Sequence, residues 1–166
     1  CQKINDKRYL LTLKPENTPI NDSPWYAFKM TAKKAATITL VMKIKGSKHR
    51  YPPKISNDGL HWKLQPYQLK KGKLTMKVAV NTQPVWIAAQ ELISNKSYFH
   101  WGEKLAKKTN TQHGLFAWSA QSRPLFKLET TGKGNEWLVI LGRQHPPEVT
   151  GALALFPFVE TLLSDS

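Results

Sequence analysis

His145 and Glu148 are the residues whose types and spacing can do chemistry in this sequence. They form an H-x-x-E pair in the stretch GRQHPPEVTG. If the backbone turns between them, an imidazole and a carboxylate at this spacing can close on one metal ion. Catalytic zinc commonly takes three protein ligands, His and Glu among them, and leaves a fourth position for water. Taken alone, the pair also fits an exposed turn histidine beside a glutamate that caps a helix.

An apolar run precedes the pair. Residues 137–141 (WLVIL) are continuously apolar, which predicts a buried strand covered on both faces, as in a parallel sheet. Pro146 and Pro147 fit a turn or the first turn of a helix. Open α/β sheets usually bind ligands at the carboxyl ends of their strands, and the predicted turn lies there.

An apolar helix is predicted after the pair. Over residues 149–163 the apolar side chains recur at helical spacing in two stripes, which indicates a largely buried helix. Pro157 lies inside it and should kink it or remove one hydrogen bond. Glu148 then falls at the helix N-terminus, where the backbone dipole favours a carboxylate.

Several segments resemble the carboxypeptidase A-like zinc carboxypeptidases, and within them the cytosolic carboxypeptidases and their bacterial relatives. GRQHPPEVTG is similar to the zinc-binding H-P-G-E segment of that family, with Pro147 in place of the glycine. Four earlier segments are similar and follow the family's order: SPWYAFKM (23–30), RYPPKISNDGLHW (50–62), VWIAAQELI (85–93) and SAQSRPLFKL (119–128). The resemblance therefore covers most of the chain.

The resemblance implies one zinc ion, with His145 and Glu148 as two of its three protein ligands. The function implied is a zinc-dependent metallocarboxypeptidase that removes C-terminal residues from peptides or proteins. In the family the third ligand, the catalytic glutamate and the substrate-binding residues follow much later. We therefore expect the catalytic residues downstream of Ser166, and we expect residues 1–166 alone to be inactive.

The expected fold is α+β. Residues 1–94 are predicted to form an amino-terminal antiparallel β-sandwich, because residues 37–45 and 74–80 alternate between apolar and polar side chains. Residues 95–166 are predicted to begin an α/β carboxypeptidase domain that is incomplete here. Its first element should be a helix over residues 97–108, capped by Ser97.

The chain has a formal net charge of +14. Its lysines mostly alternate with apolar residues on predicted strands, which favours a solvated face. The partner implied by the resemblance is a peptide or protein C-terminus, and the charge is compatible with an acidic one. No nucleic-acid partner is expected. The alternative function is a non-catalytic β-sandwich binding module whose basic face holds an acidic polymer or a partner protein.

Cys1 is the only cysteine, which excludes an internal disulfide and a cysteine-rich zinc site. No apolar run reaches the roughly 20 residues needed to span a bilayer, so no transmembrane segment is expected. We expect a cytoplasmic protein. The alternative is a periplasmic or lipid-anchored protein, if Cys1 follows a removed signal peptide.

Overall fold

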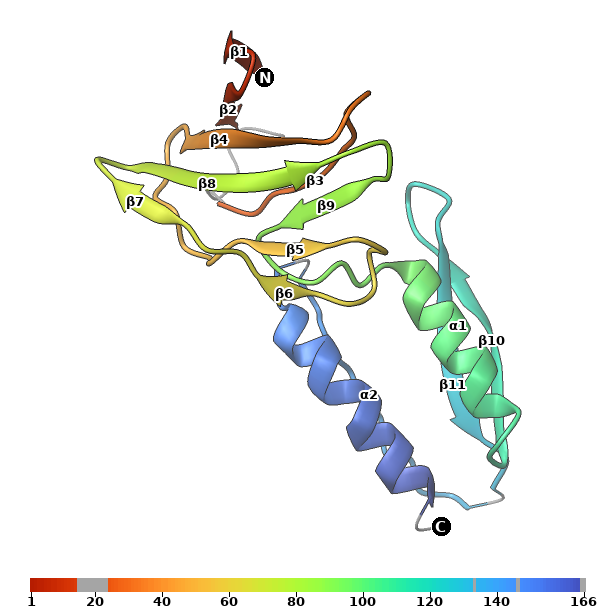
Figure 1. The fold of residues 1–166 in the computed structure, drawn as a ribbon. Helices are drawn as coiled ribbons and strands as arrows, with labels where there is room; N and C mark the ends of the chain where they lie inside the picture. Colours follow the sequence, from red (N-terminus) through yellow and green to blue (C-terminus); the bar gives the residue numbers. More distant parts are fainter. Residues whose placement is uncertain (15–23, 133, 146, 165–166) are drawn as a thin grey trace. The chain divides into compact units, whose positions relative to one another are not determined.

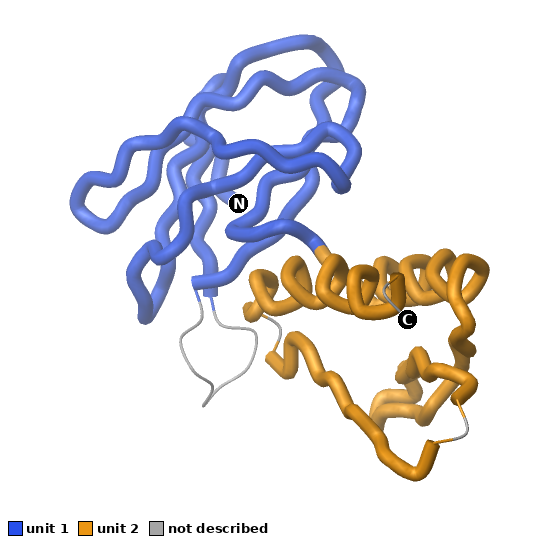
Figure 2. The backbone as a smooth tube through the Cα atoms, turned by 90° about the horizontal axis from the view of Figure 1, so that it is seen from below, with its two compact units in different colours: residues 1–92 blue, residues 93–166 orange. Residues whose placement is uncertain are grey.

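The computed structural model describes residues 1–14, 24–132, 134–145 and 147–164. The chain divides into two compact units, Cys1–Leu92 and Ile93–Ser166, drawn in blue and orange in Figure 2. Ser23, Pro146 and Ser166, which the sequence argument used, lie outside the described residues.

The first unit contains two β-sheets (Figure 1). The larger sheet has the strand order β1 (Gln2–Asn5), β2 (Arg8–Leu13), β4 (Ala36–Ile44), β8 (Lys73–Val80) and β7 (Gln68–Lys70). The smaller sheet has the order β3 (Ala27–Met30), β9 (Val85–Ala88), β5 (Lys54–Ser56) and β6 (Lys63–Leu64).

One strand pair departs from the antiparallel arrangement expected from the sequence. β2 and β4 run parallel, with Leu10 opposite Val41, while the other described strand pairs of the unit are antiparallel. The chain passes through β3, a strand of the smaller sheet, between β2 and β4. This crossover returns β4 in the direction of β2, as a parallel pair requires.

A single apolar core joins the two sheets. On β8 the even-numbered residues 74–80 are buried, whereas Lys73, Lys77 and Ala79 are exposed. The core also takes side chains from β4, β5 and β9, including Leu40, Ile55 and Ile87. Side chains of a strand point alternately to its two faces, so the predicted alternation is confirmed and one face of β8 supplies the core.

The second unit contains α1 (Asn95–Ala106), the antiparallel hairpin of β10 (Thr111–Trp118) and β11 (Pro124–Thr130), and α2 (Val149–Ser164). The chain as a whole is an α+β protein, as predicted. Among the described residues, neither helix combines the length and hydropathy needed to cross a membrane.

The predicted cap of the first helix was wrong by three residues. Ser94 is the N-cap of α1, and its side chain accepts a hydrogen bond from the Ser97 backbone N–H. Ser97 closes a capping box, because its hydroxyl accepts from the Ser94 backbone N–H in return. Two serines at this spacing satisfy both roles, and the first of them begins the helix.

The predicted strand over residues 137–141 is not formed. Trp137, Leu138, Val139 and Leu141 lie in no strand or helix, and each is more than 70% exposed. A strand buried on both faces needs neighbours that donate and accept backbone hydrogen bonds. None of the described strands pairs with this segment.

The prediction that α2 is largely buried was also wrong. Only Val149 and Ala152 are buried among its described residues, whereas Leu153 and Phe158 are about half exposed. An all-round apolar helix is buried only where other elements cover every side. Pro157 lies inside α2, as the sequence predicted.

Candidate metal site at the start of α2

The turn that carries His145 folds back on the first half of α2. Gly142 lies so close to the helix that a Cβ at this position would be 2.6 Å from Leu155 Cδ2. On the helix side, a Cβ at Gly151 would lie 3.6 Å from the Arg143 backbone nitrogen. Val149 and Ala152 are buried beside this turn. The close approach at Gly142 explains why this position, just before the H-x-x-E pair, is a glycine.

Arg143 shapes the same turn. It has a φ of 51°, in the left-handed region that a non-glycine residue rarely adopts. Its guanidinium donates a hydrogen bond to the backbone carbonyl of Ile93, the residue before the N-cap of α1. A charged donor on a partly buried carbonyl offsets part of the cost of this backbone conformation.

The turn brings the side chains of His145 and Glu148 together. His145 Nδ1 lies 2.8 Å from Glu148 Oε1, and the His145 backbone N–H donates to Glu148 Oε2 at 3.2 Å. The Glu148 backbone N–H donates to the His145 carbonyl oxygen at 3.1 Å, which closes the turn. Both side chains are largely exposed, at 71% and 51%. The pair is therefore open to an ion or ligand from solvent.

Hydrogen bonds favour the ionised form of the Glu148 carboxyl. The hydrogen bond from the His145 side chain lowers the pKa of the Glu148 carboxyl below its usual value of 4.5, and the hydrogen bond from the His145 backbone adds a smaller lowering. The carboxylate is thus ionised at neutral pH. An ionised carboxylate is the form that binds a metal ion.

The donor set of this turn fits part of a zinc site. Imidazole nitrogen and carboxylate oxygen are both common zinc ligands, at distances of about 2.0–2.2 Å. Two ligand atoms of one tetrahedral ion then lie about 3.3 Å apart. His145 Nδ1 and Glu148 Oε1 are 2.8 Å apart, so they need to move only slightly away from each other to hold one ion. In the described part of the chain, no third His, Cys, Asp or Glu joins them as a cluster. The turn supplies two ligands.

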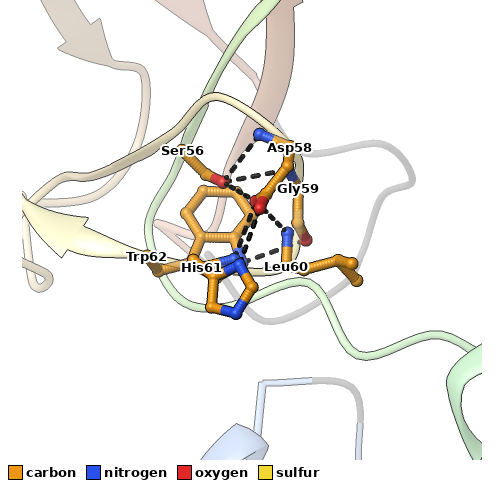
Figure 3. A network of polar contacts seen from close by, with 6 residues as sticks. All are labelled: Ser56, Asp58, Gly59, Leu60, His61 and Trp62. Atoms are coloured by element: carbon orange, nitrogen blue, oxygen red, sulfur yellow. Dashed lines mark hydrogen bonds and ion pairs between the residues drawn. The ribbon is translucent and has the colours of Figure 1, made fainter.

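A second pair with the same spacing lies in the first unit, in the loop between β5 and β6 (Figure 3). His61 Nδ1 is 2.6 Å from Asp58 Oδ2. Asp58 Oδ1 also accepts hydrogen bonds from the backbone N–H groups of Leu60 and His61, both at 2.8 Å, and from the Ser56 hydroxyl at 2.9 Å. The carboxylate thus holds the loop together.

This difference in partners separates the two pairs chemically. Hydrogen bonds hold the pKa of Asp58 well below its usual value, and the one from the His61 side chain has the largest effect. Because Asp58 Oδ1 already accepts three hydrogen bonds, little capacity is left for a cation. The Glu148 carboxylate accepts only from His145 within the described contacts. The H-x-x-E pair is therefore the better candidate for metal binding.

The other described histidines have structural contacts that the sequence did not reveal. His49 Nε2 lies 3.0 Å from the Met42 carbonyl oxygen. The His113 side chain is buried beside α1, with Nδ1 3.1 Å from Glu103 Oε1. The glutamate comes from a different element, so no local pattern could have predicted the contact. For His61, the three-residue spacing from Asp58 was a local signal that could have revealed the contact.

Comparison with known proteins shows similarity in structure alone. Neither a model of a known protein family nor a curated protein sequence matches the chain. A protein described as a carboxypeptidase A from Shewanella denitrificans OS-217 matches with a TM-score of 0.79 and 19% identity, over 98% of this chain and 45% of its own. The metallo-carboxypeptidase from Burkholderia cenocepacia matches at 0.69 and 17%, over 85% and 40%. The metallo-carboxypeptidase from Pseudomonas aeruginosa, solved with (2-guanidinoethylmercapto)succinic acid, matches at 0.62 and 18%, over 77% and 36%.

The chain has the fold of part of a bacterial metallo-carboxypeptidase. The resemblance drawn from its sequence segments is thereby confirmed for the fold. The chain spans less than half the length of each of these carboxypeptidases. Since one fold can serve several functions, the carboxypeptidase fold by itself assigns neither substrate nor activity to this chain.

Proposed function

We propose that this chain is the amino-terminal portion of a zinc-dependent metallocarboxypeptidase. Residues 1–94 would be its amino-terminal domain and residues 95–166 the beginning of its catalytic domain. The observation that carries the proposal is the convergence of His145 Nδ1 and Glu148 Oε1, 2.8 Å apart, in a chain with the fold of part of a metallo-carboxypeptidase. The likeness in fold supports a metal site at this turn beyond what the four-residue motif alone supports.

His145 and Glu148 would hold one zinc ion through Nδ1 and Oε1. Both ligands must be deprotonated to bind, and the lowered pKa of Glu148 keeps its carboxylate ready at neutral pH. When bound, zinc supplies a Lewis acid for the scissile carbonyl and a water whose pKa falls to about 7. The exposure of both side chains leaves room for a peptide C-terminus to approach.

Two ligands are fewer than the three that a catalytic zinc site takes from protein. A third ligand and a general acid–base are therefore needed for hydrolysis, and residues 1–166 by themselves are expected to be inactive. The proposed substrates are the C-terminal residues of peptides or proteins. The net charge of +14 is compatible with acidic ones.

Release of C-terminal residues tests this proposal. The full-length protein that contains residues 1–166 is incubated with a set of peptides, and shortened products are detected by mass spectrometry. We expect loss of single C-terminal residues, inhibition by a chelator and a fall of at least about 100-fold on His145→Ala, since a ligand of the metal is lost. His61→Ala is the matched control, because His61 is also an exposed histidine paired to a carboxylate three residues away. It should retain full activity.

Two results would contradict the proposal. Full peptidase activity in His145→Ala and in Glu148→Gln would show that the turn does not hold the metal. Equal losses in His145→Ala and His61→Ala would mean that removing an exposed histidine disturbs the protein in general, without a role for the turn.

A further inference from the structure

The end of the larger sheet where β7 turns into β8 can be followed in Figure 1. The strand register gathers lysines at this end. They are all exposed and are called the basic end here: Lys14, Lys43, Lys45, Lys48, Lys70, Lys71 and Lys73. In the strand register, Lys43 lies opposite Lys73, and Lys73 lies opposite Lys70. Residues directly opposite each other on antiparallel strands have Cα atoms about 5 Å apart. Three neighbouring strands thus present a row of ammonium groups.

The remaining lysines join this row through the ends of β2 and β4. Because these strands are parallel, both finish at this end of the sheet, and the Lys45 backbone N–H donates to the Leu13 carbonyl at 2.9 Å. Lys14, the residue after Leu13, therefore lies beside Lys45. Lys48 is kept near the end of β4, because the neighbouring His49 side chain is hydrogen-bonded to the Met42 carbonyl.

The acidic residues described in the first unit are engaged elsewhere. Asp6 pairs with Lys3 at 2.7 Å near the start of β2, the strand end away from Lys14. Asp58 is bound to His61, and Glu91 is paired with Lys54. Within the described residues, no ion pair involves a lysine of the basic end. As far as the described residues go, the positive charge there is available to a partner.

Two features of the basic end are unfavourable to folding. Like charges directly opposite each other on neighbouring strands are destabilising, and Lys43, Lys73 and Lys70 form two such pairs. Lys71 has a φ of 49° in the turn before Gly72, a position where Asn, Asp or Gly is normally preferred. Uncharged or turn-forming residues at these positions would make the fold more stable. The concentration of charge here therefore argues for a role in binding.

We propose that the basic end binds the surface of an anionic lipid bilayer, a role beyond the proposed peptidase function. Lysine clusters of this size are attracted to acidic headgroups in proportion to the number of charges near the surface. The cluster lies at the strand ends, so the sheet meets the bilayer end-on and side chains of both faces reach it. Leu69, 50% exposed beside Lys70, then contacts the boundary between headgroups and acyl chains. A soluble acidic polymer offers no such apolar contact.

Sedimentation with vesicles tests this proposal. The purified protein is mixed with vesicles of phosphatidylcholine alone or with increasing phosphatidylserine. We expect binding only to the anionic vesicles, with loss in about 1 M salt, where the Debye length is about 3 Å. A triple Lys→Gln variant of the row should bind about 100-fold more weakly: Lys43, Lys70 and Lys73. The matched control removes the same charge from α1 and its C-cap and should lose less than about tenfold: Lys96, Lys104 and Lys107.

A further variant separates a bilayer from a soluble acidic polymer. Leu69→Gln should weaken vesicle binding about fivefold and leave binding to polyglutamate unchanged. Thermal unfolding of the row variant should match or exceed that of the unaltered protein, because repulsion is relieved, so weaker binding would not reflect unfolding.

Three outcomes would overturn the proposal. The first is binding to phosphatidylcholine that equals binding to anionic vesicles. The second is an equal loss of vesicle binding in the two triple variants. The third is lysine-dependent binding to polyglutamate or duplex DNA without binding to anionic vesicles, which would identify a soluble acidic polymer as the occupant.

Discussion

Gly102, in the middle of α1, is the position where one added methyl group should have a clear effect. A Cβ at Gly102 would lie 2.5 Å from His113 Cδ2 and 2.6 Å from its Nε2. The His113 ring has little freedom to move, since the ring centroids of Phe99 and Phe126 lie 5.3 Å and 5.4 Å from its own. Its Nδ1 is also hydrogen-bonded to Glu103 Oε1. Gly102→Ala must therefore push a packed ring aside.

The expected effect is a balance of opposing terms. Alanine is better than glycine in a helix interior by about 1 kcal/mol. Overpacking costs about 1–3 kcal/mol, and displacing the ring weakens a hydrogen bond worth about 1 kcal/mol. We expect Gly102→Ala to lower the free energy of unfolding by about 1–2 kcal/mol. Urea denaturation followed by circular dichroism measures this value.

Gly151 in α2 provides the matched control. A Cβ there would meet its nearest neighbour, the Arg143 backbone nitrogen, at the ordinary contact distance of 3.6 Å. Gly151→Ala should therefore raise the free energy of unfolding by up to about 1 kcal/mol, through helix propensity alone. If Gly102→Ala were as stable as Gly151→Ala, the tight contact with His113 would not exist and the reasoning would be refuted.

A double variant tests the cause of the loss. His113→Ala removes the ring that the new methyl group meets. Combined with Gly102→Ala, it should cost at least about 1 kcal/mol less than the sum of the two single changes. Simple additivity would show that the effect of Gly102→Ala does not arise at His113.

Three further predictions concern the packing and capping of the fold. Ser94→Ala should cost about 1 kcal/mol in unfolding experiments, because α1 loses its N-cap; no loss would mean that Ser94 does not cap the helix. Leu74→Ala should cost about 2–5 kcal/mol, since Leu74 is fully buried, whereas Leu64→Ala at an exposed site should change stability by less than about 0.5 kcal/mol; equal effects would contradict the core. Hydrogen bonds lower the pKa of Asp58 from 3.8, so its stabilising contribution is present above pH about 4 and is lost as the pH falls further. Asp58→Asn should therefore flatten the acid side of the stability profile, and an unchanged profile would count against this loop.

Local patterns in the sequence predicted the elements that depend on local contacts. The alternation of apolar and polar residues on β8 is visible directly in the structure, with Leu74 and Met76 in the core. The three-residue spacing of His145 and Glu148 likewise predicted that the two side chains could meet. Their metal binding stays a prediction. In each case the pattern that carries the prediction lies within a few residues of sequence.

Features that depend on distant partners were not predictable in the same way. The parallel pairing of β2 with β4 depends on a crossover through the other sheet. Residues 137–141 have the composition of a buried strand, but a strand forms only where a neighbour pairs with it. His113 meets Glu103 from a different element. Sequence periodicity carries no information about which distant element lies opposite.

Zinc content tests the central claim most directly. The full-length protein that contains residues 1–166 is purified without chelators, and its metals are measured by elemental analysis. We predict about one zinc ion per chain, lost in His145→Ala and in Glu148→Gln and retained in the control His61→Ala. Zinc at the same level in all three variants would contradict a metal site at the turn before α2.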